Sequence, residues 1–149
     1  MKTVATLFAI LAGVGLVLSI AVHLCALVDV AIFGEYVWLL HVGLFIVGLP
    51  AVLYSMKLTK FSKRADFWKA ALRGCPRWMR TMTAVFFVYA IFNFSIFFLS
   101  GVTSSHLSPP PLDAVKGFSG HWMAFYAGAL AILTSASRLD ALPDCNIVR

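Results

Sequence analysis

The stretch Val4–Val28, VATLFAILAGVGLVLSIAVHLCALV, decides the fold of this protein. It contains no Lys, Arg, Asp or Glu, and it is longer than the about 20 apolar residues that a helix needs to cross a bilayer. Working outward, residues 36–56, 81–101 and 118–137 form three more uncharged, mostly apolar stretches of that length. The sequence therefore predicts an all-α integral membrane protein with four transmembrane helices.

The composition supports a membrane protein over a water-soluble one. Of the 149 residues, 61% are hydrophobic and 12% are charged, whereas soluble domains have about 45–50% apolar and about 25% charged residues. A small soluble domain leaves much of its surface in water and cannot bury this excess of apolar residues. We expect residues 1–149 to form a single membrane domain, most simply an up-down bundle in which consecutive helices are antiparallel.

The positions of Lys and Arg predict the orientation in the membrane. Eleven of the twelve basic residues fall on one side of the four predicted spans: Lys2, Arg138, Arg149 and the eight in residues 57–80. Lys116 falls on the other side, together with Asp29, Glu35 and Asp113. Because basic residues remain on the cytoplasmic side, both termini and the 57–80 connection are predicted to be cytoplasmic. The expected location is a cell membrane, typically the bacterial inner membrane.

The basic connection, residues 57–80, carries a helical pattern of its own. Phe61, Ala65, Trp68 and Leu72 recur on one face, with cations elsewhere around the helix. This pattern is typical of a short amphipathic helix in the headgroup plane, and it predicts contact with anionic lipid headgroups rather than with nucleic acid.

All four histidines are predicted to lie in the outer half of the membrane or in the outer connection. His23, His41 and His121 belong to spans, and His106 belongs to the connection before the fourth span. His23 shares a helix face with Ser19 and Gly15, and Gly120 lies beside His121. Small residues let helices approach closely, so these faces are expected to pack inside the bundle and to bring the three imidazoles of the spans together.

Two kinds of cofactor suit such a cluster. Two imidazoles on opposite sides of a cavity can ligate haem b, and His41 with His121 is the preferred pair, with His23 as the alternative. A transition metal such as zinc or copper needs three or four ligands, which His23, His41, His121, His106 and Cys25 could supply. The structural alternative is that these histidines pack at the membrane interface without binding anything.

A further polar residue, Asn93, lies near the middle of the third span, with Tyr89 one turn before it. An amide at this depth more often forms a hydrogen bond between helices than binds a substrate, so we expect Asn93 to bond a neighbouring helix.

The motifs that the sequence lacks argue against several enzyme classes, and two functions remain. The chain contains no glycine-rich phosphate loop, no HExxH and no nucleophile elbow, and its three cysteines form no CxxC pair. We therefore prefer a non-catalytic accessory subunit or scaffold, associated with other membrane subunits or with copies of itself. The alternative is a haem b-binding or metal-binding electron-transfer protein that uses the outer histidines.

Overall fold

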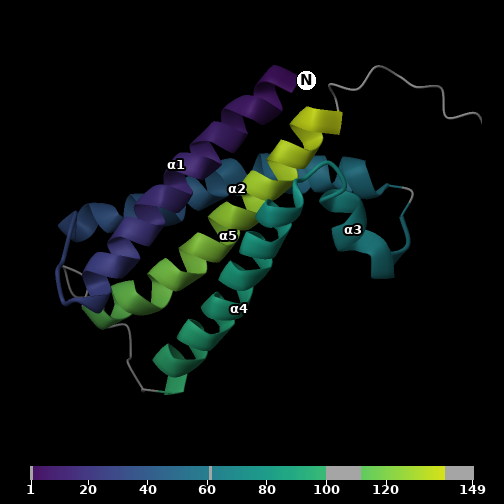
Figure 1. Cartoon of the computed structure of the whole chain (residues 1–149). Coiled ribbons are helices and arrows are strands. Elements are labelled where there is room, and N and C mark those ends of the chain that lie inside the picture. The colour runs from purple at the N-terminus through teal and green to yellow at the C-terminus, as the bar shows by residue number, and fades with distance from the viewer. Residues whose placement is uncertain (1, 61, 100–111, 140–149) are drawn as a thin grey trace, which may run out of the picture.

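The computed structural model describes residues 2–60, 62–99 and 112–139, and within these ranges the protein is helical without strands (Figure 1). A lone Phe61 and the stretch with His106 lie outside the described residues. The long helices match the four predicted stretches, with ends that differ by up to six residues. In chain order the elements are α1 (Lys2–Leu27), η1 (Gly34–Val37), α2 (Trp38–Thr59), η2 (Arg64–Asp66), α3 (Phe67–Ala71), α4 (Arg77–Leu99) and α5 (Leu112–Leu139).

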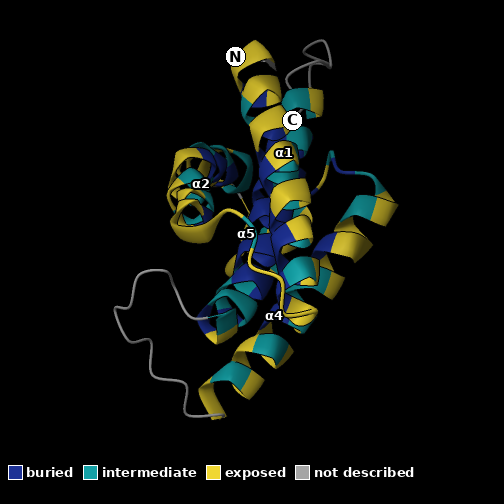
Figure 2. Ribbon diagram, turned by 90° about the vertical axis from the view of Figure 1, so that its left-hand side faces the viewer, coloured by how far each residue is buried: buried dark blue, intermediate teal, exposed yellow. Residues whose placement is uncertain are grey.

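Helix α5 forms the centre of the molecule, with α1, α2 and α4 packed around it (Figure 2). More than half of the α5 residues are buried, whereas α4 buries only Thr83 and Ala90. The buried α5 residues are mostly small, which allows the three surrounding helices to approach its backbone closely. The large apolar side chains of α1, α2 and α4 are instead exposed on the outside of the bundle.

The directions of the helices follow from their contacts with α5. Early residues of α5 meet late residues of α1 and α4, and late residues of α5 meet early residues of both, so α5 is antiparallel to each. The pairs are His23 with Ser119 and Gly13 with Leu130 between α1 and α5, and Asn93 with Gly117 and Thr83 with Ala127 between α4 and α5.

Within the described residues, three helices are long and apolar enough to cross a membrane: Thr3–Leu27, Gly34–Thr59 and Arg77–Leu99. These correspond to the first three predicted spans. Helix α5 has 28 residues, more than any of the three, but it is less apolar. The three apolar helices agree with a membrane protein, and α5 is not among the helices that meet this criterion.

The segment between α2 and α4 is helical over a shorter range than the sequence pattern suggested. A 3-10 turn at Arg64–Asp66 leads into α3. The ring of Trp68 lies 6.1 Å from that of Phe87 on α4, and Leu72 packs against Ala131 of α5. The apolar side of this segment is therefore docked at least partly on the bundle rather than directed only to lipid headgroups.

Candidate functional site between α1, α4 and α5

A chain of hydrogen bonds centred on His23 joins three helices in the core. The imidazole is 3% exposed; its Nδ1 lies 2.7 Å from the Ser119 hydroxyl on α5, and its Nε2 is bonded to the Tyr89 hydroxyl on α4. Ser119 has one hydroxyl proton, which it donates to the carbonyl of Val115 at 2.6 Å. In the tautomer that keeps this bond, Nδ1 carries a proton and donates it to Ser119, and Nε2 accepts from Tyr89. A neutral imidazole satisfies every bond in this chain.

Asn93 forms the second polar link between α4 and α5. Its Nδ2 donates to the carbonyls of Lys116 and Gly117, at 2.9 and 3.1 Å. Gly120 makes this approach possible, because a Cβ at that position would lie 2.5 Å from Nδ2. The expectation that Asn93 bonds a neighbouring helix is confirmed.

An ion-pair cluster lies at the start of α5. The ammonium of Lys116 is 2.8 Å from a carboxylate oxygen of Asp29 and 3.6 Å from one of Asp113. The hydrogen bond to Asp29 raises the pKa of Lys116, so the side chain stays cationic at all physiological pH values. This cluster holds the connection between α1 and α2 against the first turn of α5.

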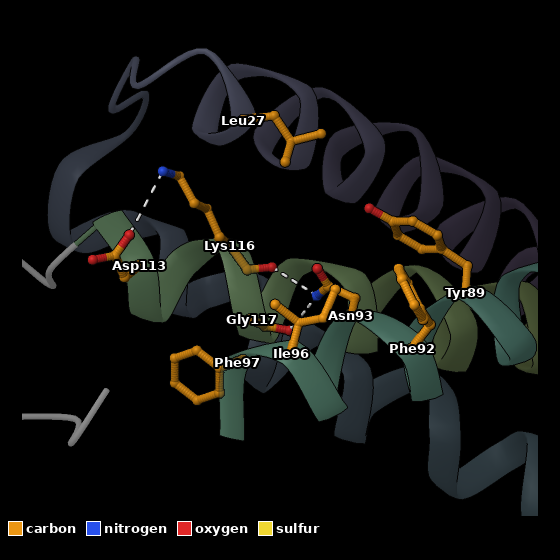
Figure 3. Close-up of a pocket in the computed structure, with 9 residues that line it drawn as sticks. All are labelled: Leu27, Tyr89, Phe92, Asn93, Ile96, Phe97, Asp113, Lys116 and Gly117. Atoms are coloured by element: carbon orange, nitrogen blue, oxygen red, sulfur yellow. Dashed lines mark hydrogen bonds and ion pairs between the residues drawn. The ribbon is translucent and has the colours of Figure 1, made fainter. Parts of the chain in front are cut away.

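These polar residues border a groove of about 430 Å³, within the usual range for sites that bind small molecules (Figure 3). Its walls are mostly apolar and aromatic, with Tyr89 and Asn93 on the α4 side and Lys116 and Asp113 at the start of α5. The remaining lining residues are Leu27, Phe92, Ile96, Phe97 and Gly117.

His41 of α2 and His121 of α5, the pair preferred for haem, take part in different contacts. The Nδ1 of His41 accepts a hydrogen bond of 3.0 Å from the indole nitrogen of Trp122, which joins α2 to α5. His121 instead packs among aromatic rings, 4.5 Å from Phe125 and 6.4 Å from Phe94 of α4. Consecutive residues of a helix point about 100° apart, so the rings of His121 and Trp122 are directed differently.

The candidate metal ligands are not gathered into one site within the described part of the chain. Residues 2–60, 62–99 and 112–139 contain no group of three or more His, Cys, Asp or Glu that could hold a metal ion. Cys25 is a free, partly buried thiol, and both ring nitrogens of His23 are engaged by Ser119 and Tyr89. The fifth candidate, His106, lies outside the described residues. The metal prediction therefore gains no support from these positions.

Sequence reasoning missed the parts of this site that α5 contributes. Ser119 and Lys116 have no spacing that distinguishes them from ordinary interface residues. One available indication was the pairing of Lys116 with Asp29 and Asp113 on the same predicted side of the membrane. Opposite charges near one membrane surface tend to pair. Because Asp29 and Lys116 are far apart along the chain, the sequence could not show that these two would form an ion pair.

The comparisons with known proteins add no relatives from which a role could be transferred: no family model, no curated protein and no solved structure matches this chain.

Proposed function

We propose that all four long helices cross a cell membrane, with both termini and the 57–80 connection in the cytoplasm. The length of α5 supports the fourth span, because 28 residues extend about 42 Å against a hydrocarbon core of about 30 Å. Its position supports it too, since α5 packs among three helices that are apolar enough to span. A central helix touches little lipid and can be less apolar than its neighbours.

We further propose that the protein is a non-catalytic membrane subunit or scaffold that packs against another membrane protein or a second copy. The observation that carries this proposal is the open stripe of α5, formed by His121 and Phe125. These residues lie between the α5 positions that face α4, such as Gly128, and those that face α2, such as Trp122. His121 is partly exposed there, and Phe125 is 44% exposed.

The polarity of the open stripe is the reason to expect a partner. Polar side chains at membrane depth usually face a protein interior, because lipid cannot satisfy their hydrogen bonds. A partner helix over the open stripe would cover His121 and add to the aromatic packing around Phe125. The core side chains of His23 and Asn93 already hold helices together and are accounted for by the fold.

Site-specific photo-cross-linking tests this proposal. A photoreactive phenylalanine analogue at position 125 should give a protein adduct of discrete mass in native membranes. The matched control is the same analogue at position 98 on α4, where the native Phe98 is 76% exposed and belongs to the lipid-facing surface. We expect position 98 to yield lipid adducts without the discrete protein band. Equal labelling at both positions would count against the open stripe as an interface.

A second measurement separates the subunit from a cofactor protein. Substitution of His41 or His121 by Ala should leave the natively produced, purified protein colourless, free of stoichiometric metal and folded as before. A reduced-minus-oxidised absorption spectrum with elemental analysis provides the readout. A haem spectrum that disappears in either variant would replace the subunit proposal with the electron-transfer one.

A further inference from the structure

The groove beside Lys116 has a particular balance of hydrogen-bonding atoms. Both N–H groups of the Asn93 amide are used by the α5 carbonyls, but its oxygen accepts no hydrogen bond within the described part of the chain. Figure 3 shows this oxygen and the Tyr89 hydroxyl directed toward α1, across the groove. Because the Tyr89 proton is given to His23, the Tyr89 oxygen also faces the groove as an acceptor. The inner wall therefore offers acceptors and no free donor among these groups.

The charges at the groove also favour a ligand that carries a cationic hydrogen-bond donor. Lys116 is paired with two carboxylates, of Asp29 and Asp113, so the cluster carries one more negative than positive charge. The Asp113 side chain is 64% exposed and lines the groove, which leaves its carboxylate accessible to a ligand. A ligand complementary to this cluster carries a cation with N–H donors for Asp113 and an anion for Lys116.

The apolar walls define the rest of the ligand. Leu27 of α1 and Phe92 and Ile96 of α4 line the groove, and each of them is more than half exposed on the surface of the bundle. In a bilayer these side chains meet acyl chains. A molecule bound here would have its polar end at the charged cluster and its hydrocarbon part along α1 and α4.

We infer that the groove binds one zwitterionic phospholipid with a primary amine in its headgroup. The ammonium binds Asp113, the phosphate binds Lys116, and an acyl chain lies against Leu27 and Phe92. Charge complementarity selects this class. A purely anionic headgroup meets two carboxylates, and a trimethylammonium headgroup has no N–H to donate.

The inference uses the membrane placement given under the proposed function but does not depend on the partner. Lipid binding is measured on the purified chain, whereas partner binding is measured at the open stripe in native membranes. One can fail while the other holds.

Native mass spectrometry of the full chain provides the test. The protein is reconstituted with equal amounts of phosphatidylethanolamine, phosphatidylcholine and phosphatidylglycerol of identical acyl chains and then released into mild detergent. We expect the phosphatidylethanolamine adduct to exceed each of the others by about fivefold, the size of preference that one partly exposed charged contact supports.

Three variants locate the site. Asp113→Asn should reduce the preference for phosphatidylethanolamine over phosphatidylcholine to near one, and Lys116→Gln should weaken binding of all three lipids. Leu27→Trp should block the groove, whereas Leu24→Trp is its matched control, since Leu24 is a similarly exposed leucine of α1 that does not line the groove. Circular dichroism confirms that each variant remains folded.

The inference is overturned if phosphatidylcholine or phosphatidylglycerol binds as well as phosphatidylethanolamine. It is also overturned if Leu24→Trp and Leu27→Trp reduce the adduct equally, or if the purified protein carries a lipid-soluble molecule without an amine in its place.

Discussion

Gly120→Ala is the substitution whose effect the structure specifies most closely. The added methyl group would lie 2.5 Å from the Asn93 amide nitrogen and 3.1 Å from its carbonyl carbon, both closer than ordinary van der Waals contact. The amide must move away, and it then loses its hydrogen bonds to the carbonyls of Lys116 and Gly117. The contact between α4 and α5 is weakened at its most polar point.

The expected magnitude combines three effects. Two interhelical hydrogen bonds in a membrane contribute about 0.6 kcal/mol each on average, and up to about 1.7 kcal/mol. Overpacking adds about 1–3 kcal/mol, while replacing Gly by Ala in a helix returns about 1 kcal/mol. We therefore expect Gly120→Ala to lower the free energy of unfolding by about 1–3 kcal/mol.

Reversible unfolding in mixed detergent micelles, followed by circular dichroism, measures this difference. Gly48→Ala on α2 is the matched control, because a Cβ there meets nothing within 4 Å, and it should be neutral or slightly stabilising. In an Asn93→Ala background the clash with the amide is gone, so Gly120→Ala should cost much less than in the native chain. Strictly additive effects of the two substitutions would refute the proposed contact.

Three more predictions test other parts of the core. Tyr89→Phe removes the donor to the buried Nε2 of His23 and should lower the free energy of unfolding by about 1–3 kcal/mol; an unchanged value would contradict the hydrogen-bond chain. Gly15→Ala places a methyl group 2.2 Å from a ring carbon of Tyr126, whose hydroxyl is fixed by a backbone carbonyl of α2. It should destabilise by a similar amount, and stabilisation would contradict this packing. Burial raises the pKa of the Cys75 thiol despite two nearby arginines. Maleimide labelling of Cys75 in the folded protein should therefore be slow at pH 7 and should accelerate about tenfold per pH unit. A fast rate without pH dependence would contradict the burial of this thiol.

The sequence predicted the long helices because their apolar side chains produce both the hydropathy pattern and the helices' apolar surfaces. The helices α1, α2 and α4 expose their large apolar side chains, so an uninterrupted apolar run marks each of them. Helix α5 begins at Leu112, six residues before the predicted span. The prediction began later because the first turns of α5 contain the charged residues of the Lys116 cluster, which an uncharged apolar stretch excludes.

The central position of α5 could not be derived from hydropathy. Hydropathy measures how well a segment tolerates lipid, and α5 is largely covered by protein. Its many small residues did indicate close packing, and the expected packing faces of Gly15 and Gly120 are confirmed by their contacts with Tyr126 and Asn93. The spacing of the small residues in α5 could not show that α1, α2 and α4 would all pack against them.

The candidate site was predicted in part. His23 was expected to face the bundle interior, and it does. The expected proximity of three imidazoles depended on rotations of α2 and α5 that no local pattern determines. Trp122, the neighbour of His121, forms the hydrogen bond with His41, and His121 is left on the open stripe.

Reporter fusions at three positions test the central claim, that α5 crosses the membrane inside a shell of three apolar helices. A reporter active only in the cytoplasm should function when fused within residues 57–80 and again after Arg149, while a reporter active only outside should function within residues 100–111. If the reporters at residues 57–80 and after Arg149 lie on opposite sides of the membrane, α5 does not cross it and the account is wrong.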